Sequence, residues 1–150
     1  MLASQIAIRN HRKEKLDMLQ AGLLNIAGNN NLEEDISTMF ISYIDILTVW
    51  HIRILVFLSN PREWFEKNNI IKPNIHMGST THLLEAAMPE LKDDKERYNQ
   101  MIKDLYNRNL VRNDSISGMM TADAMYQSRT TTTGNQFLDF ITSPINDIES

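Results

Sequence analysis

Apolar positions near the N-terminus recur with the spacing of an amphipathic helix. They are Leu16, Leu19, Leu23 and Ile26, at steps of three, four and three residues. This spacing places all four side chains, called here the N-terminal stripe, on one side of a helix. Gly28 and the asparagines at 29–31 tolerate the left-handed conformation of a helix end. The pattern therefore predicts a helix that stops near residue 28.

A second helix is predicted after these asparagines. Asn31 is placed to cap it, and acidic residues follow in its first turn, where the helix dipole favours them. Its apolar positions are Ile36, Phe40, Tyr43 and Leu47. Residues 1–47 are thus expected to form an N-terminal helical pair.

Helical patterns continue to residue 109. Residues 49–58 are apolar on nearly every side, which predicts a central helix, and Pro61 suits the first position of a short fourth helix. Residues 68–78 are expected to connect it to a helix that opens at 79–81 and closes near Pro89. The most regular register belongs to the helix predicted from Asp93 or Asp94 to Asn109, a residue that can adopt the left-handed conformation of a helix end. Its buried face is predicted to hold Tyr98, Met101, Ile102, Leu105 and Tyr106.

The pattern changes after residue 109. Leu110 and Val111 begin a short predicted strand, turn residues occupy 113–118, and the threonine-rich segment 124–133 is predicted to return as a second strand. A short helix is expected after Gly134, followed by an acidic tail at 143–150. The predicted fold class is mainly α with a small β-hairpin.

This order of elements resembles that of a winged-helix domain. Residues 104–111, Asp-Leu-Tyr-Asn-Arg-Asn-Leu-Val, resemble the end of the recognition helix and the first wing strand of MarR-like or PadR-like regulators, with Asn109 where glycine is usual. Residues 131–138, Thr-Thr-Thr-Gly-Asn-Gln-Phe-Leu, are similar to the Thr-x-x-Gly that follows the wing. The resemblance covers residues 48–142 and implies a winged-helix-like domain there.

The resemblance also implies a nucleic-acid surface, because the third helix of such regulators enters the major groove. The candidate DNA-binding residues are Arg97, Asn99, Gln100, Lys103, Asn107 and Arg108. Amides can pair with adenine edges, and arginines can reach guanine or phosphate.

Acidic residues lie close to these candidates. Asp93, Asp94 and Glu96 precede or accompany them, and the predicted wing adds Asp114 and Asp123 with no lysine or arginine at 113–128. Since affinity for DNA comes largely from phosphate neutralisation, the acids disfavour DNA as a partner. A solvated or protein-contacting face is favoured.

Composition excludes several classes of protein. The chain has 150 residues, 42% hydrophobic and 23% charged, and a formal net charge of −4. These values are typical of one globular domain or two very small ones, and they exclude whole-chain disorder. The absence of cysteine excludes disulfides, thiolate zinc sites and cysteine catalysis.

Two adjacent methionines, Met119 and Met120, are expected either beneath the wing or available to a partner.

No catalytic signature is present in the sequence. It lacks a Gly-x-Ser-x-Gly elbow, a glycine-rich phosphate loop followed by lysine, and a Gly-x-Gly-x-x-Gly motif. His76, His82 and Glu85 come nearest to a metal set, but a third firm ligand is missing and the spacing is that of chance. His51, within an apolar helix, is interpreted as a hydrogen-bonded core or boundary residue. We therefore predict no enzyme, no cofactor and no metal.

Localisation follows from two further segments. The N-terminus lacks the basic region and long apolar core of a signal peptide. The apolar stretch 39–58 contains Asp45, His51 and Arg53, which are costly in lipid. The basic run of Arg9, Arg12, Lys13 and Lys15 is interpreted as a solvated helix face. These patterns predict a cytoplasmic protein without a membrane partner.

The expected function is that of a non-enzymatic interaction or oligomerisation module. The N-terminal stripe is about two heptads long, too short for a stable free coiled coil. It is therefore predicted to be buried both against the second helix and against a second chain, in a homodimer or with another protein. The alternative is a winged-helix DNA-binding transcriptional regulator.

Overall fold

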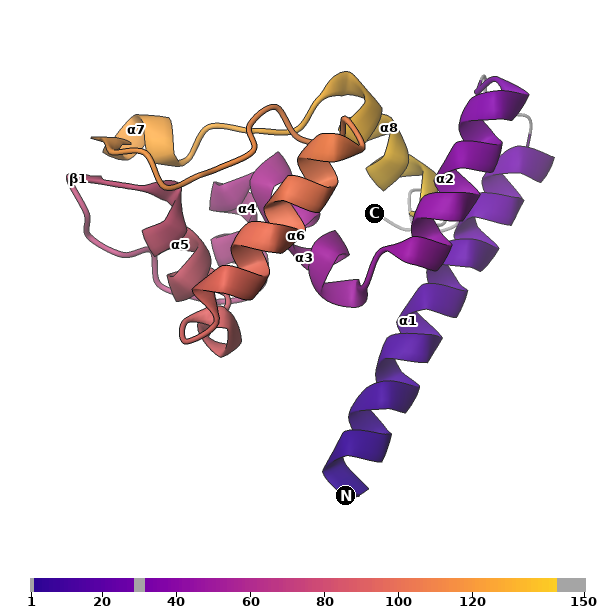
Figure 1. The fold of residues 1–150 in the computed structure, drawn as a ribbon, viewed down its shortest axis with the longest axis horizontal. Helices are drawn as coiled ribbons and strands as arrows, with labels where there is room; N and C mark the ends of the chain where they lie inside the picture. Colours follow the sequence, from indigo (N-terminus) through magenta and orange to yellow (C-terminus); the bar gives the residue numbers. More distant parts are fainter. Residues whose placement is uncertain (1, 29–31, 143–150) are drawn as a thin grey trace. The chain divides into compact units, whose positions relative to one another are not determined.

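A computed structural model describes residues 2–28 and 32–142 of the chain. Within these ranges the chain is mainly helical, with one small two-stranded antiparallel sheet (Figure 1). The predicted helical character and the presence of a small antiparallel sheet are confirmed, but the predicted hairpin is wrong, because three helical elements separate the two strands in the sequence. The acidic tail at 143–150 and the predicted cap Asn31 lie outside the described residues.

The contacts divide the chain into two compact units. The terminal unit contains the described residues up to Val49 and those from Gln136 onward, and the central unit contains Trp50–Asn135. The first unit is therefore built from both ends of the described sequence, whereas the second is continuous.

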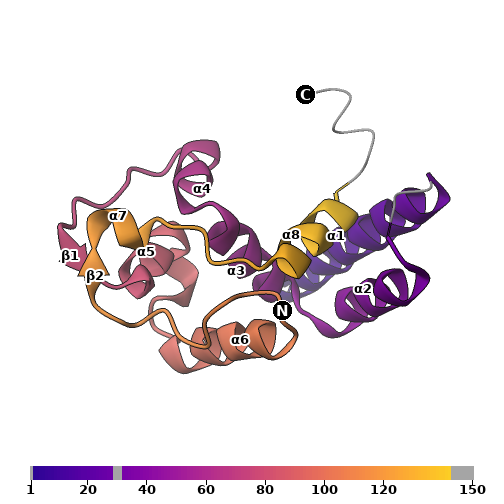
Figure 2. The same cartoon turned by 90° about the horizontal axis from the view of Figure 1, so that it is seen from above.

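In the terminal unit, α1 (Leu2–Ala27) and α2 (Glu34–Ile46) lie side by side and run in opposite directions (Figures 1 and 2). The end of α8 (Thr132–Phe140) completes the unit. Phe40 of α2 packs against Phe137 and Phe140 of α8, with ring centroids 5.3 and 5.4 Å apart. Asn25 of α1 donates a hydrogen bond to the carbonyl oxygen of Phe140 at 2.8 Å. Aromatic packing and this side-chain cap hold α8 to the two N-terminal helices.

The side of α1 that packs within the chain is not the predicted one. Ala21 and Gly22 are buried, whereas Leu16, Leu23 and Ile26 are 64%, 54% and 43% exposed. The prediction that the N-terminal stripe is buried against the second helix is therefore wrong for these three residues. The reason is a close approach that needs a small residue, because a Cβ at Gly22 would lie 2.6 Å from the Phe140 ring. The aromatic cluster selects the glycine side of α1 and leaves the stripe outside.

The central unit is built around α3. Its helices and strands are α3 (Val49–Ser59), α4 (Pro61–Lys67), β1 (Met77–Gly78), α5 (Thr80–Ala87), the 3₁₀ turn η1 (Pro89–Leu91), α6 (Lys95–Asn107), β2 (Met120–Thr121) and α7 (Ala122–Met125). Ile54, Leu55, Phe57 and Leu58 of α3 are fully buried. The predicted central position of this helix is confirmed. On α6, Tyr98, Met101, Ile102 and Leu105 are buried as predicted, but Tyr106 is 45% exposed and does not belong to the buried face.

The small sheet is not formed by the predicted pair of strands. β1 pairs with β2 in antiparallel register, Met77 with Thr121 and Gly78 with Met120. The predicted pairing of residues 110–111 with 124–133 is reduced to one antiparallel bridge between Val111 and Thr130. Residues 122–125 form α7 instead, because the Thr121 hydroxyl accepts a hydrogen bond from the backbone N–H of Ala124 and so caps a helical turn. Thr121 therefore both ends β2 and caps α7.

The end of α6 confirms one detailed prediction. Asn109 adopts the left-handed conformation, with φ of 58°. The turn is fixed by Thr131, whose hydroxyl donates to the carbonyl oxygen of Asn109 at 2.6 Å and accepts from the backbone N–H of Gly134 at 2.8 Å. Thr131 thus closes the end of α6 and opens α8, which begins at Thr132 rather than after Gly134.

Among the helices in the described ranges, none is by itself long and apolar enough to cross a membrane. α2 and α3 reach the required length and hydropathy only when they are taken together, as two helices separated by a bend.

Candidate functional site

Helix α6 carries the candidate DNA-binding residues on its surface. Arg97, Asn99, Gln100, Lys103 and Asn107 are exposed, and Arg108, the residue after the helix, is half-buried. Gln100, Lys103 and Asn107 follow one another at steps of three and four and so share a face with Glu96, opposite the buried face. The structure brings five of the six side chains to solvent, and Glu96 accompanies them.

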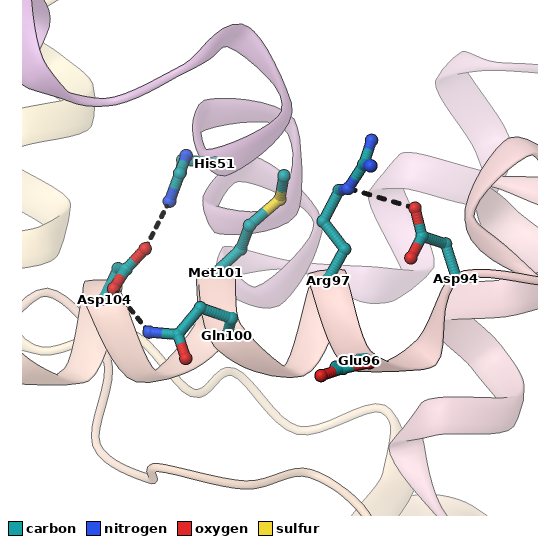
Figure 3. Close-up of a pocket in the computed structure, with 7 residues that line it drawn as sticks. All are labelled: His51, Asp94, Glu96, Arg97, Gln100, Met101 and Asp104. Carbon is teal, nitrogen blue, oxygen red and sulfur yellow. Dashed lines mark hydrogen bonds and ion pairs between the residues drawn. The ribbon is translucent and has the colours of Figure 1, made fainter.

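An open pocket of about 510 Å³ runs along one side of α6. It is lined by His51, Asp94, Glu96, Arg97, Gln100, Met101 and Asp104. Figure 3 shows His51 of α3 and Gln100 of α6 converging on Asp104, with Arg97 turned toward Asp94. The pocket is therefore bordered by two separate polar contacts.

The first contact links two helices of the central unit. His51 Nε2 lies 2.9 Å from Asp104 Oδ2, and Gln100 Nε2 donates to Asp104 Oδ1 at 3.0 Å. The prediction that His51 is a hydrogen-bonded core or boundary residue is confirmed, since the residue is buried and paired with Asp104. Its partner could not be read from the sequence, because 53 positions separate the two residues.

The ionisation of Asp104 is set by opposing effects. Burial acts to raise the pKa of this carboxyl, but the hydrogen bonds with His51 and Gln100 and the charges of His51 and Arg108 together bring its pKa below the usual value. The folded protein therefore favours the carboxylate at position 104.

This shift predicts a pH-dependent effect of Asp104→Asn. A lowered pKa contributes stability that is complete above the unfolded-state value of about 4 and is lost as pH falls through the lower folded-state value. The variant should be less stable than the parent at pH 7, and the difference should shrink as the pH falls below about 4. Urea unfolding at a series of pH values measures it. Asp93→Asn, at an exposed position, is the control, and a constant difference across the series would contradict the assignment.

The second contact occupies the start of α6. The side chain of Asp94 makes no capping hydrogen bond and instead accepts one from Arg97 Nε at 3.0 Å. Arg97 therefore has its charge balanced by a residue one turn away. Two of the six candidate residues are engaged with acids close to them in sequence, Arg97 with Asp94 just before α6 and Gln100 with Asp104 within it.

The segment after α6 contains two arginines that are used structurally. Arg112 donates to the carbonyl oxygens of Thr130 and Ser128, each at 3.1 Å. Arg129 donates to the hydroxyl of Thr80 at 3.2 Å and to the side-chain oxygen of Asn113 at 3.2 Å. Burial, followed by the charge of Arg112, lowers the pKa of Arg129. The sequence pattern does not mark Arg129 as a structural residue, although it is the one base at 113–150.

The nearest metal candidates do not form a site. The His82 ring accepts a hydrogen bond from the backbone N–H of Ser79, and Glu85 accepts one from the phenol of Tyr98 at 2.9 Å. Burial raises the pKa of Tyr98, and the hydrogen bond and charge of Glu85 raise it further. Within residues 2–28 and 32–142, no three histidine or acidic residues are arranged to hold a metal ion.

The adjacent methionines have different environments. Met119 is 70% exposed, whereas the sulfur of Met120 accepts hydrogen bonds from Arg129 at 3.0 Å and from the Thr80 hydroxyl at 3.7 Å. The sequence leaves two positions open for this pair, beneath the predicted wing or available to a partner. Met120 is half-buried against Arg129, and Met119 is exposed.

The terminal unit carries a second candidate surface. A groove of about 530 Å³ between α1 and α2 is lined by Lys15, Leu19, Thr38, Ile41, Ser42, Ile44 and Asp45. Lys15 Nζ closes part of it by donating to the carbonyl oxygen of Asp45 at 2.8 Å. Leu19 is the member of the N-terminal stripe that lines the groove, and the exposed Leu16 and Leu23 lie one turn to either side of it. Leu19 therefore connects the exposed stripe to a groove whose lining is partly apolar and partly polar, a connection that periodicity alone did not reveal.

Comparison of the chain with family models, curated proteins and solved structures finds no significant match. Its function has to be inferred from the geometry of the described residues.

Proposed function

We propose that this chain is a non-enzymatic interaction module that self-associates through the N-terminal stripe. The observation that carries this proposal is the exposure of Leu16, Leu23 and Ile26, three large aliphatic side chains on one side of one helix. Single exposed apolar residues are normal on a protein surface, but a contiguous apolar patch marks an interaction site.

The energetics of the surface support the proposal. Covering apolar surface is favourable by about 25 cal/mol per Å². Three stripe residues keep a large part of this surface in water in the single chain. The neighbouring groove, with Leu19, Ile41 and Ile44, supplies further apolar wall against which a partner side chain can pack. A second chain that covers both features recovers this free energy.

The test is light scattering and sedimentation of the full chain over a range of concentrations. We expect a dimer whose population rises with concentration, and we expect Leu16→Glu with Leu23→Glu to make the chain monomeric while its helical circular dichroism is retained. Ile71→Glu with Met77→Glu, which places the same charges on exposed apolar residues of the central unit, is the matched control and should leave the dimer intact. A chain that stays monomeric at high concentration would refute self-association.

A winged-helix DNA-binding regulator is the second candidate. It is supported by the helix pair α5 and α6, by the left-handed Asn109 after α6, and by the exposure of Gln100, Lys103 and Asn107 on one face. Glu96 on the same face and the pairing of Arg97 with Asp94 reduce the positive charge that phosphate contact requires. It ranks below the interaction module for this reason.

On this face of α6, the attraction of DNA phosphates by the basic residues and their repulsion by the acidic residues are expected to be nearly equal. We therefore expect weak non-specific binding to DNA at most. The measurement is a titration with mixed-sequence duplex DNA at about 50 and about 200 mM salt, a range in which phosphate contacts lose much of their affinity. Submicromolar affinity at the lower salt would reverse the ranking if it fell steeply with salt and was lost in Lys103→Glu with Arg108→Glu. Lys67→Glu with Lys72→Glu, which reverses two exposed charges at the end of α4 and in the segment after it, is the control and should not change the affinity.

A further inference from the structure

Two unpaired charge clusters of opposite sign lie at the two ends of the helical hairpin formed by α1 and α2. Arg12 and Lys13, one turn before Leu16 on α1, are exposed and have no acidic partner among the described residues. Glu33, Glu34 and Asp35 at the start of α2 are exposed and likewise have no basic partner there. We call the first pair the basic end and the three acids the acidic end. Within the described residues, no ion pair joins either cluster to a side chain of opposite charge.

We propose that a second copy of this chain covers the N-terminal stripe in antiparallel orientation, so that the basic end of each protomer contacts the acidic end of the other. This inference rests on the proposed self-association and adds its geometry.

The spacing of the stripe fits an antiparallel alignment. The four residues are symmetric about position 21, so an antiparallel copy centred there brings Leu16 opposite the partner's Ile26 and Leu19 opposite the partner's Leu23. Every exposed stripe residue then faces another stripe residue. The groove beside Leu19 provides space next to the same contact.

The same alignment brings the basic end of one protomer close to the acidic end of the other. Arg12 and Lys13 lie about 5 Å along the helix axis before Leu16, so they lie about as far beyond the partner's Ile26. That position is just past the end of the partner's α1, where its α2 begins with the three acids. A twofold axis repeats the contact, so two basic-to-acidic contacts form in each dimer.

The end of α1 provides a further reason for this orientation. The last turn of α1 contains no basic residue, so the negative end of its helix dipole has no cation beside it within its own helix. The basic end of an antiparallel copy would supply that cation. A parallel copy would place basic end against basic end and acidic end against acidic end, and both contacts would be repulsive.

Charge reversal distinguishes the two orientations. In an antiparallel dimer, Arg12→Glu with Lys13→Glu creates acid-to-acid contacts, and Glu33→Lys with Glu34→Lys creates contacts between basic residues. Each double variant should therefore dimerise at least ~10-fold more weakly than the parent at low salt, and the chain that carries all four changes should recover to within ~3-fold. In a parallel dimer each cluster faces its own copy, so charge reversal replaces a repulsion between like charges of one sign by a repulsion between like charges of the other sign. The double variants should therefore not weaken a parallel dimer.

A distance measurement gives a second readout. The natural chain has no cysteine, so Lys13→Cys accepts a single spin label. The two labels of an antiparallel dimer centred at residue 21 are separated by at least about 24 Å along the axis, whereas those of a parallel dimer lie roughly 10 Å apart.

The outcomes separate this inference from the function on which it rests. A monomer at all concentrations would overturn both. A dimer that is lost in Leu16→Glu with Leu23→Glu but is insensitive to charge reversal, with labels at the short distance, would leave self-association standing and overturn the antiparallel geometry. Weakening by each double variant, recovery in the fourfold variant and the long distance would support it.

Discussion

Replacing Leu105 with alanine is expected to lower the free energy of unfolding by roughly 2–5 kcal/mol, the range found for a fully buried leucine. Leu105 is completely buried on α6 beside Tyr98 and Ile102. Its carbonyl oxygen also accepts the backbone N–H of Leu110, in the turn that follows the helix. A cavity at this position therefore removes packing at a point where α6 and the next segment are joined.

Urea denaturation measures this loss, and a neighbour on α6 provides the control. Tyr106→Ala truncates a larger side chain that is 45% exposed, so its effect should be much smaller. If Leu105→Ala melted within a degree or two of the parent, or if the two variants lost equal stability, the register of α6 would be wrong.

Gly134→Ala is expected to destabilise the chain by about 1–3 kcal/mol, in the direction opposite to helix propensity. Gly134 lies in the first turn of α8, where alanine would ordinarily be the better helix former. A Cβ at this position, however, would lie well inside the contact distance of the Leu110 carbonyl oxygen. A backbone atom cannot rotate away as a side chain can, so the segment itself would have to shift.

Gly118→Ala is the matched control for this substitution. No heavy atom of another residue lies within 4 Å of a Cβ built at Gly118, so the change should be close to neutral. Thermal unfolding of both variants measures their stability relative to the parent. A Gly134→Ala chain at least as stable as the parent would show that α8 does not approach Leu110 this closely.

Features of the fold that depend on local contacts can be predicted from the sequence, whereas features decided by contacts between distant residues cannot. The register of α6 and the left-handed Asn109 follow from a short pattern, and both are confirmed at Leu105 and at Asn109. The side of α1 that packs is decided by Phe140, more than a hundred residues away. Periodicity identifies an apolar side but cannot choose between it and a small-residue side that admits an aromatic ring.

The second misplaced element has a similar cause. The threonine-rich segment 124–133 has strand propensity, but Thr131 within it uses its hydroxyl to cap α8, and Thr121 just before it caps α7. The sequence predicts correctly that the candidate DNA-binding residues within α6 lie on its exposed side, because the spacing of apolar residues within this one helix determines which side is buried. The pairing of Asp104 with His51 and the groove beside Leu19 depend on contacts between elements, which the sequence pattern does not specify.

The division of the terminal unit between both ends of the described sequence has a consequence for synthesis on the ribosome. The central unit is continuous over Trp50–Asn135 and can form its contacts as soon as that stretch has emerged. The core around Phe40 has to wait for Phe137 and Phe140, which are made about a hundred residues later. During this interval the nascent chain carries an unfilled aromatic site on α2, and it is in this state that binding by a chaperone would matter most.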